Sequence, residues 1–222
     1  HAGDTADLAT VVAAVTSRFP GRPLAAAGYS LGGNVLLKWL GEQGDNVPLT
    51  AACAVSVPFE LAPCAARLDI GFSRLYRNRL RDELLRNLRA KEISLRVAGN
   101  IDEAARIRAL GDLSTIRTFR DFDGRVIAPL HGFRDADDYY ARSSARAFLR
   151  TIAIPTRIIH ALDDPFMTPA VVPDPKELSA AVTLELSAHG GHVGFVHGTP
   201  WRPRYWLEET IPAWLAGLLP QH

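Results

Sequence analysis

The sequence is poor in cysteine, balanced in charge and free of long apolar runs. Only two of its 222 residues are cysteines, which leaves a disulfide framework unsupported and predicts reduced, buried thiols in a cytoplasmic protein. Lysine and arginine total 25 against 24 acidic residues, a net charge of +1, so no field of one sign marks a nucleic-acid partner or a membrane surface. The longest mostly apolar stretch without a charge, Val47 to Phe59, contains two prolines and is too short to span a bilayer. We expect a small, weakly charged partner and no stable membrane insertion.

The length and the hydrophobic content of the chain are enough for one sizeable domain. Hydrophobic residues make up 47% of the chain and charged residues 22%, which excludes disorder and collagen-like repeats. The chain starts at His1 and leads straight into a helical pattern without an upstream strand or signal peptide. We therefore expect a piece of a longer protein, with the N-terminal portion of that protein as its partner.

The apolar residues alternate between two periodicities. Helical spacing predicts a helix over residues 5–18 and a closing helix after Tyr205, kinked by Pro212. A helical pattern also resumes at Gly33. Short apolar runs typical of strands buried on both faces cover residues 24–29, 49–57, 156–161 and 181–187. Strands separated by helices in this way predict an α/β fold, a parallel sheet with helices on its faces.

An insertion of different composition separates the second and third of these strands. We place it at residues 59–150, as a helical cap on a core made of residues 1–58 and 151–222. The insertion holds most of the arginines, and acidic residues are interleaved with them, which favours a solvated helix face over an anion-binding patch. These arginines include Arg74, Arg77, Arg79, Arg81, Arg86 and Arg89.

A G-x-S-x-G motif lies at residues 28–32, after a predicted buried strand and before a predicted helix. In that position the motif indicates a nucleophile elbow, in which a strained turn exposes the hydroxyl of Ser30. The flanking Gly28 and Gly32 are expected because a Cβ at either place would collide with the neighbouring strand or helix. The backbone N–H of Leu31, directly after the serine, is a candidate oxyanion donor.

A serine nucleophile needs a base and an orienting acid, which follow later in the chain in this kind of fold. Asp163 and Asp164 follow the third predicted strand. Asp164 is favoured because it precedes Pro165, which directs it out of the loop, whereas Asp163 suits a local turn.

The candidate base follows the fourth predicted strand. His192 lies among Gly190, Gly191 and Gly194, a flexible backbone that can bring an imidazole over the serine. His189 and His197 lack glycines on both sides. The histidines also lack the spacing of a zinc site, so we expect neither a metal nor a cofactor.

Four segments together resemble the YheT-like branch of the α/β-hydrolases, over essentially the whole chain. That branch comprises bacterial proteins assigned as esterases, fungal enzymes that make or hydrolyse medium-chain fatty-acid ethyl esters, and animal α/β-hydrolase-domain lipases. The segments are Gly-Tyr-Ser-Leu-Gly-Gly-Asn at 28–34, Pro-Leu-His-Gly-Phe-Arg-Asp-Ala-Asp-Asp-Tyr-Tyr at 129–140 with the serine pair Ser143 and Ser144, His-Ala-Leu-Asp-Asp-Pro-Phe-Met at 160–167 and Gly-Gly-His-Val-Gly-Phe at 190–195.

The resemblance implies the α/β-hydrolase fold, of which this chain would be the C-terminal portion, with Ser30 as nucleophile, Asp164 as acid and His192 as base. It further implies that the segment from Phe133 to residue 140 shapes the acyl pocket of the cap. The sequence departs from the family before residue 1, where the family has several strands and a His-Gly loop that supplies the second oxyanion donor. That N-terminal portion is therefore expected to complete the protein.

We expect a serine hydrolase acting on small-molecule carboxylic esters with an apolar, short- to medium-chain acyl group. Tyr29, beside the nucleophile, and the aromatic residues Phe133 and Phe166 are the candidate substrate contacts. Two alternatives stay open: acyl transfer to an alcohol instead of water, and a catalytically impaired fragment that acts only as a binding module.

Overall fold

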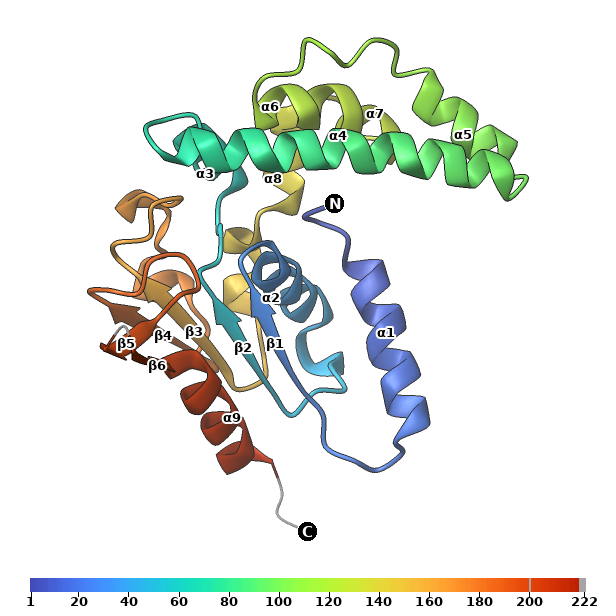
Figure 1. Cartoon of the computed structure of the whole chain (residues 1–222). Coiled ribbons are helices and arrows are strands. Elements are labelled where there is room, and N and C mark those ends of the chain that lie inside the picture. Colours follow the sequence, from blue (N-terminus) through green and yellow to red (C-terminus); the bar gives the residue numbers. More distant parts are fainter. Residues whose placement is uncertain (200, 220–222) are drawn as a thin grey trace. The chain divides into compact units, whose positions relative to one another are not determined.

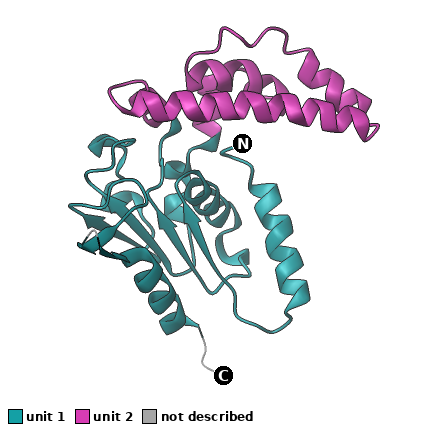
Figure 2. Cartoon of the chain, viewed as in Figure 1, with its two compact units in different colours: residues 1–61, 143–222 teal, residues 62–142 magenta. Residues whose placement is uncertain are grey.

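The computed structural model describes residues 1–199 and 201–219. The chain divides into two compact units, one of residues 1–61 with 143–222 and one of residues 62–142 (Figure 2). The sequence predicts the insertion at residues 59–150.

The first unit is built on a parallel sheet of four strands in the order β1-β2-β3-β4. Each strand pairs in parallel with the next along the chain, and the strand ends at Tyr29, Val55, Ala161 and Ser187 lie at one edge of the sheet. The predicted α/β fold is confirmed. The strands are β1 (Ala25–Tyr29), β2 (Ala51–Val55), β3 (Thr156–Ala161) and β4 (Val182–Ser187).

Helices cover both faces of this sheet (Figure 1). The helices α1 (Thr5–Arg18) and α2 (Leu31–Gln43) share one apolar cluster with β2 and β3, in which Leu37 and Ile158 are fully buried. The opposite face packs on α9 (Trp206–Leu218) through Cys53, Ile159 and Ile211. Both helices predicted at the ends of the sequence are therefore present. Pro212 lies inside α9.

A separate antiparallel hairpin was not predicted. It joins β5 (Val196–Thr199) to β6 (Arg202–Tyr205), and all eight of its residues are exposed. Short 3₁₀ turns complete the described part of this unit, at Gly44–Asn46, Ala145–Thr151, Pro169–Val171 and Pro175–Glu177.

Residues 62–142 form a helical unit with its own core. Ile116, Phe122 and Val126 are buried together, against leucines that include Leu85 and Leu88 of the long helix α4. Its elements, with α3 starting one residue earlier and α8 ending one residue later, are α3 (Leu61–Arg67), α4 (Ser73–Val97), α5 (Ile101–Arg108), α6 (Phe119–Phe122), a π-helical turn (Asp123–Ile127), α7 (Ala128–His131) and α8 (Ala136–Ser143). Within the described part of the chain, no helix combines the length and hydropathy needed to cross a membrane.

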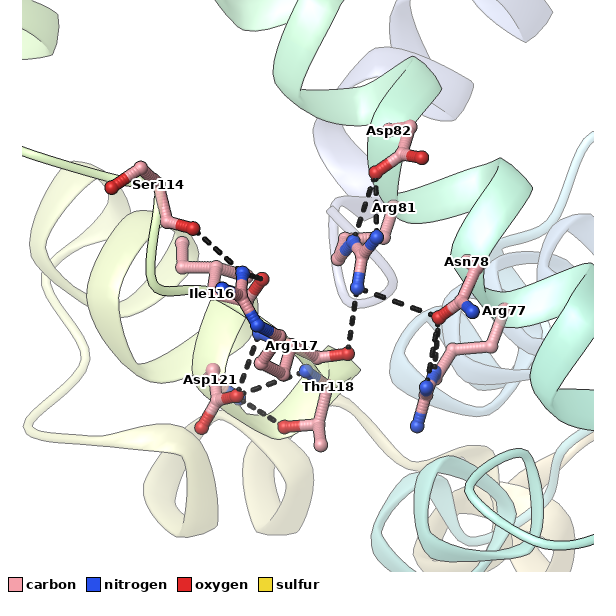
Figure 3. Close-up of polar contacts among 9 residues, drawn as sticks. All are labelled: Arg77, Asn78, Arg81, Asp82, Ser114, Ile116, Arg117, Thr118 and Asp121. Atoms are coloured by element: carbon pink, nitrogen blue, oxygen red, sulfur yellow. Dashed lines mark hydrogen bonds and ion pairs between the residues drawn. The ribbon is translucent and has the colours of Figure 1, made fainter.

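The arginines of α4 divide into two groups. Arg81 donates to the side chain of Asp82 at 2.8 Å and to the carbonyl of Arg117 at 3.1 Å, which ties α4 to the loop before α6 (Figure 3). Arg77 is buried and pairs with Asp69 at 2.5 Å, so the expected solvated face is wrong for this residue. It is right for the exposed Arg74, Arg79, Arg86 and Arg89.

In the loop before α6, the side chains of Thr118 and Asp121 cap the start of that helix reciprocally (Figure 3).

Asp123 makes the stability of this unit depend on pH. Burial raises the pKa of its carboxyl to about 6, although the Tyr140 hydroxyl donates to it at 2.7 Å. Because its pKa in the folded state exceeds the ordinary value, the protonated Asp123 carboxyl favours the folded state. This contribution to the free energy of unfolding is fully present below about pH 4 and is lost as the pH rises through 6. We expect Asp123→Asn to raise the free energy of unfolding at pH 7.5 by up to roughly 2 kcal/mol, and with it the melting temperature. At pH 4 we expect no such gain.

Thermal unfolding at the two pH values measures this effect. The matched control is Asp137→Asn, at an exposed carboxylate that pairs with Arg120 at 2.6 Å and should give no gain at pH 7.5. An equal gain for Asp123→Asn at both pH values would contradict the assignment.

Candidate active site

Ser30 lies on a strained turn between β1 and α2. Its φ is +49°, a region that non-glycine residues rarely occupy. Its backbone N–H donates to the carbonyl of Val55 at 2.8 Å, so the turn is held to the end of β2.

Two glycines let the strand and the helix approach at this turn. A Cβ on Gly28 would lie 2.8 Å from the Cα of Gly33, and a Cβ on Gly33 would lie 2.7 Å from a methyl group of Val57. Gly32, in contrast, faces open space. The expected collision at Gly28 is therefore correct, but the expected collision at Gly32 is wrong, because the close contact falls on the next residue.

A chain of hydrogen bonds joins three of the candidate residues. His192 Nε2 lies 2.9 Å from Ser30 Oγ, and His192 Nδ1 lies 2.8 Å from Asp164 Oδ2. The carboxylate is almost inaccessible, with 1% of its side chain exposed, whereas 12% of the imidazole is exposed. The hydrogen bonds thus lead from a buried carboxylate to a hydroxyl at the carboxyl ends of the strands.

The acid and the imidazole are further fixed by Phe166. Its backbone N–H donates to Asp164 Oδ1 at 2.9 Å, so both carboxylate oxygens accept hydrogen bonds. Its ring meets the His192 ring edge-on, with centroids 4.7 Å apart. These contacts restrict rotation of both side chains.

Asp163 has a different set of contacts from its neighbour. Its carboxylate accepts the backbone N–H of Gly191 at 2.8 Å and lies 3.3 Å from Nδ1 of the exposed His189. The Gly191 N–H is the main reason that the pKa of Asp163 is lowered. His197, the other histidine considered from the sequence, lies in the exposed strand β5.

Two further titratable groups are buried among the strands. Burial lowers the pKa of His160 and raises the pKa of the Cys53 thiol to about 11, so both are neutral near pH 7. A thiol in this state is a poor nucleophile. Among the described residues, no three His, Cys, Asp or Glu side chains are grouped so that they could hold a metal ion.

Comparison with known proteins shows the family of the chain. The family model described as "alpha/beta hydrolase fold" matches residues 1–199. The chain belongs to this family. It is 42% identical over 219 residues to the Escherichia coli protein YheT, which is named as a candidate esterase. The matched region is 99% of this chain and 62% of that protein. It is 34% identical over 196 residues to mouse phospholipase ABHD3, covering 88% of this chain and 46% of that one.

This α/β-hydrolase chain therefore spans between about half and two thirds of the length of these two relatives. A third relative, the monoacylglycerol lipase of Saccharomyces cerevisiae, is 30% identical over 198 residues, 88% of this chain and 43% of the lipase. Among solved structures, an acylaminoacyl peptidase in complex with a chloromethyl ketone shares the fold, with a TM-score of 0.50 at 15% identity over 89% of this chain and 24% of that one.

The remaining candidate residues of this α/β-hydrolase differ in their surroundings. Leu31 is the first residue of α2, so its N–H has no carbonyl partner within that helix. The side chain of Tyr29, 44% exposed, lies on the sheet face that carries Cys53 and Val55. Phe133 lies in the helical unit, where its ring is 5.2 Å from that of Tyr139.

One contact of the α/β-hydrolase site was missed from the sequence. Ser56, directly after β2, accepts the backbone N–H of Val193 at 3.2 Å, so it reaches the residue that follows His192. The signal available in the sequence was a polar residue at the carboxyl end of a buried strand, where functional groups of open α/β sheets lie.

Proposed function

We propose that the chain carries the nucleophile, base and acid of a serine carboxylic ester hydrolase. The observation that supports this most strongly is the continuous set of hydrogen bonds from Asp164 through His192 to Ser30, with distances of 2.8 and 2.9 Å. The positive φ of the serine adds to it, since strained backbone of this kind clusters at active sites.

In the acylation step, Ser30 Oγ attacks the ester carbonyl carbon while His192 Nε2 takes the hydroxyl proton. The C–O bond to the alcohol then breaks, and the imidazolium returns the proton to the leaving oxygen. Asp164 holds the proton on Nδ1, which keeps Nε2 available as the acceptor.

Deacylation repeats these steps with water. His192 removes a proton from the water, the resulting hydroxide attacks the acyl-enzyme, and the proton passes to Ser30 as the acid leaves. The backbone N–H of Leu31, at the start of α2, would donate to the oxyanion in both steps.

The substrate we propose is an uncharged ester with an apolar, short- to medium-chain acyl group. Phe166 beside His192 supplies an apolar wall at the reacting centre. Phe133, whose ring packs on that of the buried Tyr139, is the proposed contact from the helical unit, for which we propose the role of a cap. Tyr29, next to the nucleophile, is the remaining proposed contact.

A series of p-nitrophenyl esters tests the proposed activity. We expect kcat/KM to rise with acyl length from acetate to medium chains and to fall at least about 10-fold for an acyl chain ending in a carboxylate, because a charge would be desolvated in the pocket. Preferred turnover of charged acyl groups would contradict the proposed substrate class. Formation of an ethyl ester in ethanol-containing buffer would identify an alcohol as the acyl acceptor instead of water.

The free edge of β1 is the basis of a proposal about the N-terminal portion. Within the described sheet β1 is an edge strand, and its residues Ala27 and Tyr29 are exposed. An exposed apolar edge favours aggregation and pairing with another strand. We propose that an upstream segment pairs with β1 and supplies the second oxyanion donor.

Expression of residues 1–222 with and without the upstream portion tests this pairing. We expect residues 1–222 alone to be poorly soluble and about 10²- to 10³-fold less active, the usual cost of a missing oxyanion donor. Recovery of solubility and activity together on adding the upstream portion is the expected result. A monodisperse and fully active preparation of residues 1–222 alone would contradict it.

The state of the two cysteines bears on the location of the protein. Cys53 and Cys64 are buried and form no disulfide, which is the usual state of cysteines in a reducing compartment. We propose a cytoplasmic location on this basis.

A further inference from the structure

The loop that carries His192 is strained next to the imidazole. Val193 has a φ of +57° and Phe195 a φ of +44°. For a β-branched residue such as valine this backbone conformation is a genuine outlier. Strain of this kind persists only where the surrounding structure enforces it, so the contacts of this loop must supply the constraint.

Two hydrogen bonds hold the loop at the residues directly before and after His192. The N–H of Gly191 donates to Asp163 Oδ1 at 2.8 Å, and the N–H of Val193 donates to Ser56 Oγ at 3.2 Å. The acceptors come from two different strand ends, so the loop is held from two directions. Phe195 N–H closes the turn by donating to the carbonyl of Gly190 at 2.9 Å.

Ser56 is well placed to act as a fixed point. It is fully buried, and its own N–H donates to the carbonyl of Ile159 at 2.9 Å, which continues the ladder between β2 and β3. Its φ is +51°, which is unusual for a serine. The sheet thus holds the backbone of Ser56 where its hydroxyl reaches the histidine loop.

Asp163 provides the second fixed point, next to the acid. Its neighbour Leu162 donates its N–H to the carbonyl of Ser187 at 2.8 Å, so the start of this loop is tied to β4. The carboxylate of Asp163 is a charged acceptor, and charge-assisted hydrogen bonds are stronger than neutral ones. The same short loop therefore orients the imidazole through Asp164 and the backbone before it through Asp163.

We propose that Ser56 and Asp163 are positioning residues that hold the loop of residues 190–195 from both sides, so that His192 Nε2 stays within hydrogen-bond reach of Ser30 Oγ. This inference rests on the proposed hydrolase function. Its physical basis is that proton transfer requires the base at hydrogen-bond distance, and a displacement of about 1 Å can cost about 10²-fold in rate.

Two substitutions of Ser56 separate the hydroxyl from the backbone strain. Alanine and glycine both remove the acceptor for Val193. Alanine keeps the Cβ that serine carries at this positive φ, whereas glycine adopts the conformation without strain. We expect both variants to lower kcat about 3- to 10-fold at unchanged KM, the scale of one lost hydrogen bond. Wild-type kcat in the glycine variant would overturn the proposed role of the hydroxyl.

Asp163, which is exposed, allows a variant that leaves the core intact. Asp163→Ala removes the acceptor for Gly191 and is expected to lower kcat about 3- to 10-fold, whereas Asp163→Asn keeps an acceptor oxygen and should retain most of it. His189→Ala is the matched control, since it removes only the exposed partner of Asp163. A loss in the His189 variant equal to that in Asp163→Ala would attribute the effect to the contact between the two side chains and overturn the proposal.

Amide hydrogen exchange in the unaltered protein and the Ser56→Gly and Asp163→Ala variants gives a readout that does not depend on activity. We expect faster exchange confined to residues 190–195. If the unaltered protein hydrolyses no ester, the proposed function fails. If it is active and the variants match it in both kcat and exchange, the positioning role alone fails.

Discussion

Ser30→Ala is expected to lower kcat for ester hydrolysis by up to about 10⁶-fold, the loss expected when the covalent path is removed from an efficient serine hydrolase. The substitution removes the Oγ that lies 2.9 Å from His192 Nε2 and leaves the base with nothing to activate. Alanine carries the same Cβ as serine at a φ of +49°, so the turn itself should persist. Steady-state kinetics on the most active p-nitrophenyl ester measures the loss.

Ser144→Ala is the control for this result. Ser144 belongs to a serine pair of the chain, but its Oγ accepts the backbone N–H of Leu61 at 3.0 Å and so has a structural contact. We expect near-normal turnover in this variant. If Ser144→Ala removed turnover and Ser30→Ala retained it, the assignment of the nucleophile would be wrong.

Asp164→Asn is expected to lower kcat by about 10⁴-fold, because the amide would not hold the proton on His192 Nδ1 and the imidazole would adopt the wrong tautomer. The contact concerned is the 2.8 Å hydrogen bond between Asp164 Oδ2 and Nδ1. KM should change little, since the carboxylate is buried behind the imidazole and is shielded from substrate.

The adjacent residue supplies a matched substitution. Asp163→Asn changes the same functional group one position away, where the carboxylate meets Gly191 N–H rather than His192. Its amide oxygen can still accept that N–H, so we expect a loss below about 3-fold. Equal losses at the two positions would contradict the assignment of Asp164 as the acid.

The regular elements could be predicted because they bury one or both faces. Helix α1 has the predicted bounds of residues 5–18 and β3 has those of 156–161, since apolar spacing alone defines such segments. The β5–β6 hairpin has only exposed residues, so no apolar period marks it. The position of the close glycine contact was also wrong by one residue, because it depends on how Val57 packs against the helix.

The site was predictable to the extent that its residues occupy strand ends with recognisable neighbours. Ser30 has a motif around it, and the candidate acid and base follow later strands. Ser56 also follows a strand, but no motif or glycine-rich context surrounds it, and its relevance arises from a contact with Val193, which is 137 positions away in the sequence. A single serine after an apolar strand carries no information about that partner.

Mapping of a fluorophosphonate adduct is the measurement that tests the central claim most directly, since the reagent reports an activated serine even where turnover is slow. We expect one adduct, on the peptide that carries Ser30, and its loss in the His192→Ala variant. An adduct on Ser143 or Ser144, or ester hydrolysis without labelling of Ser30, would contradict the account.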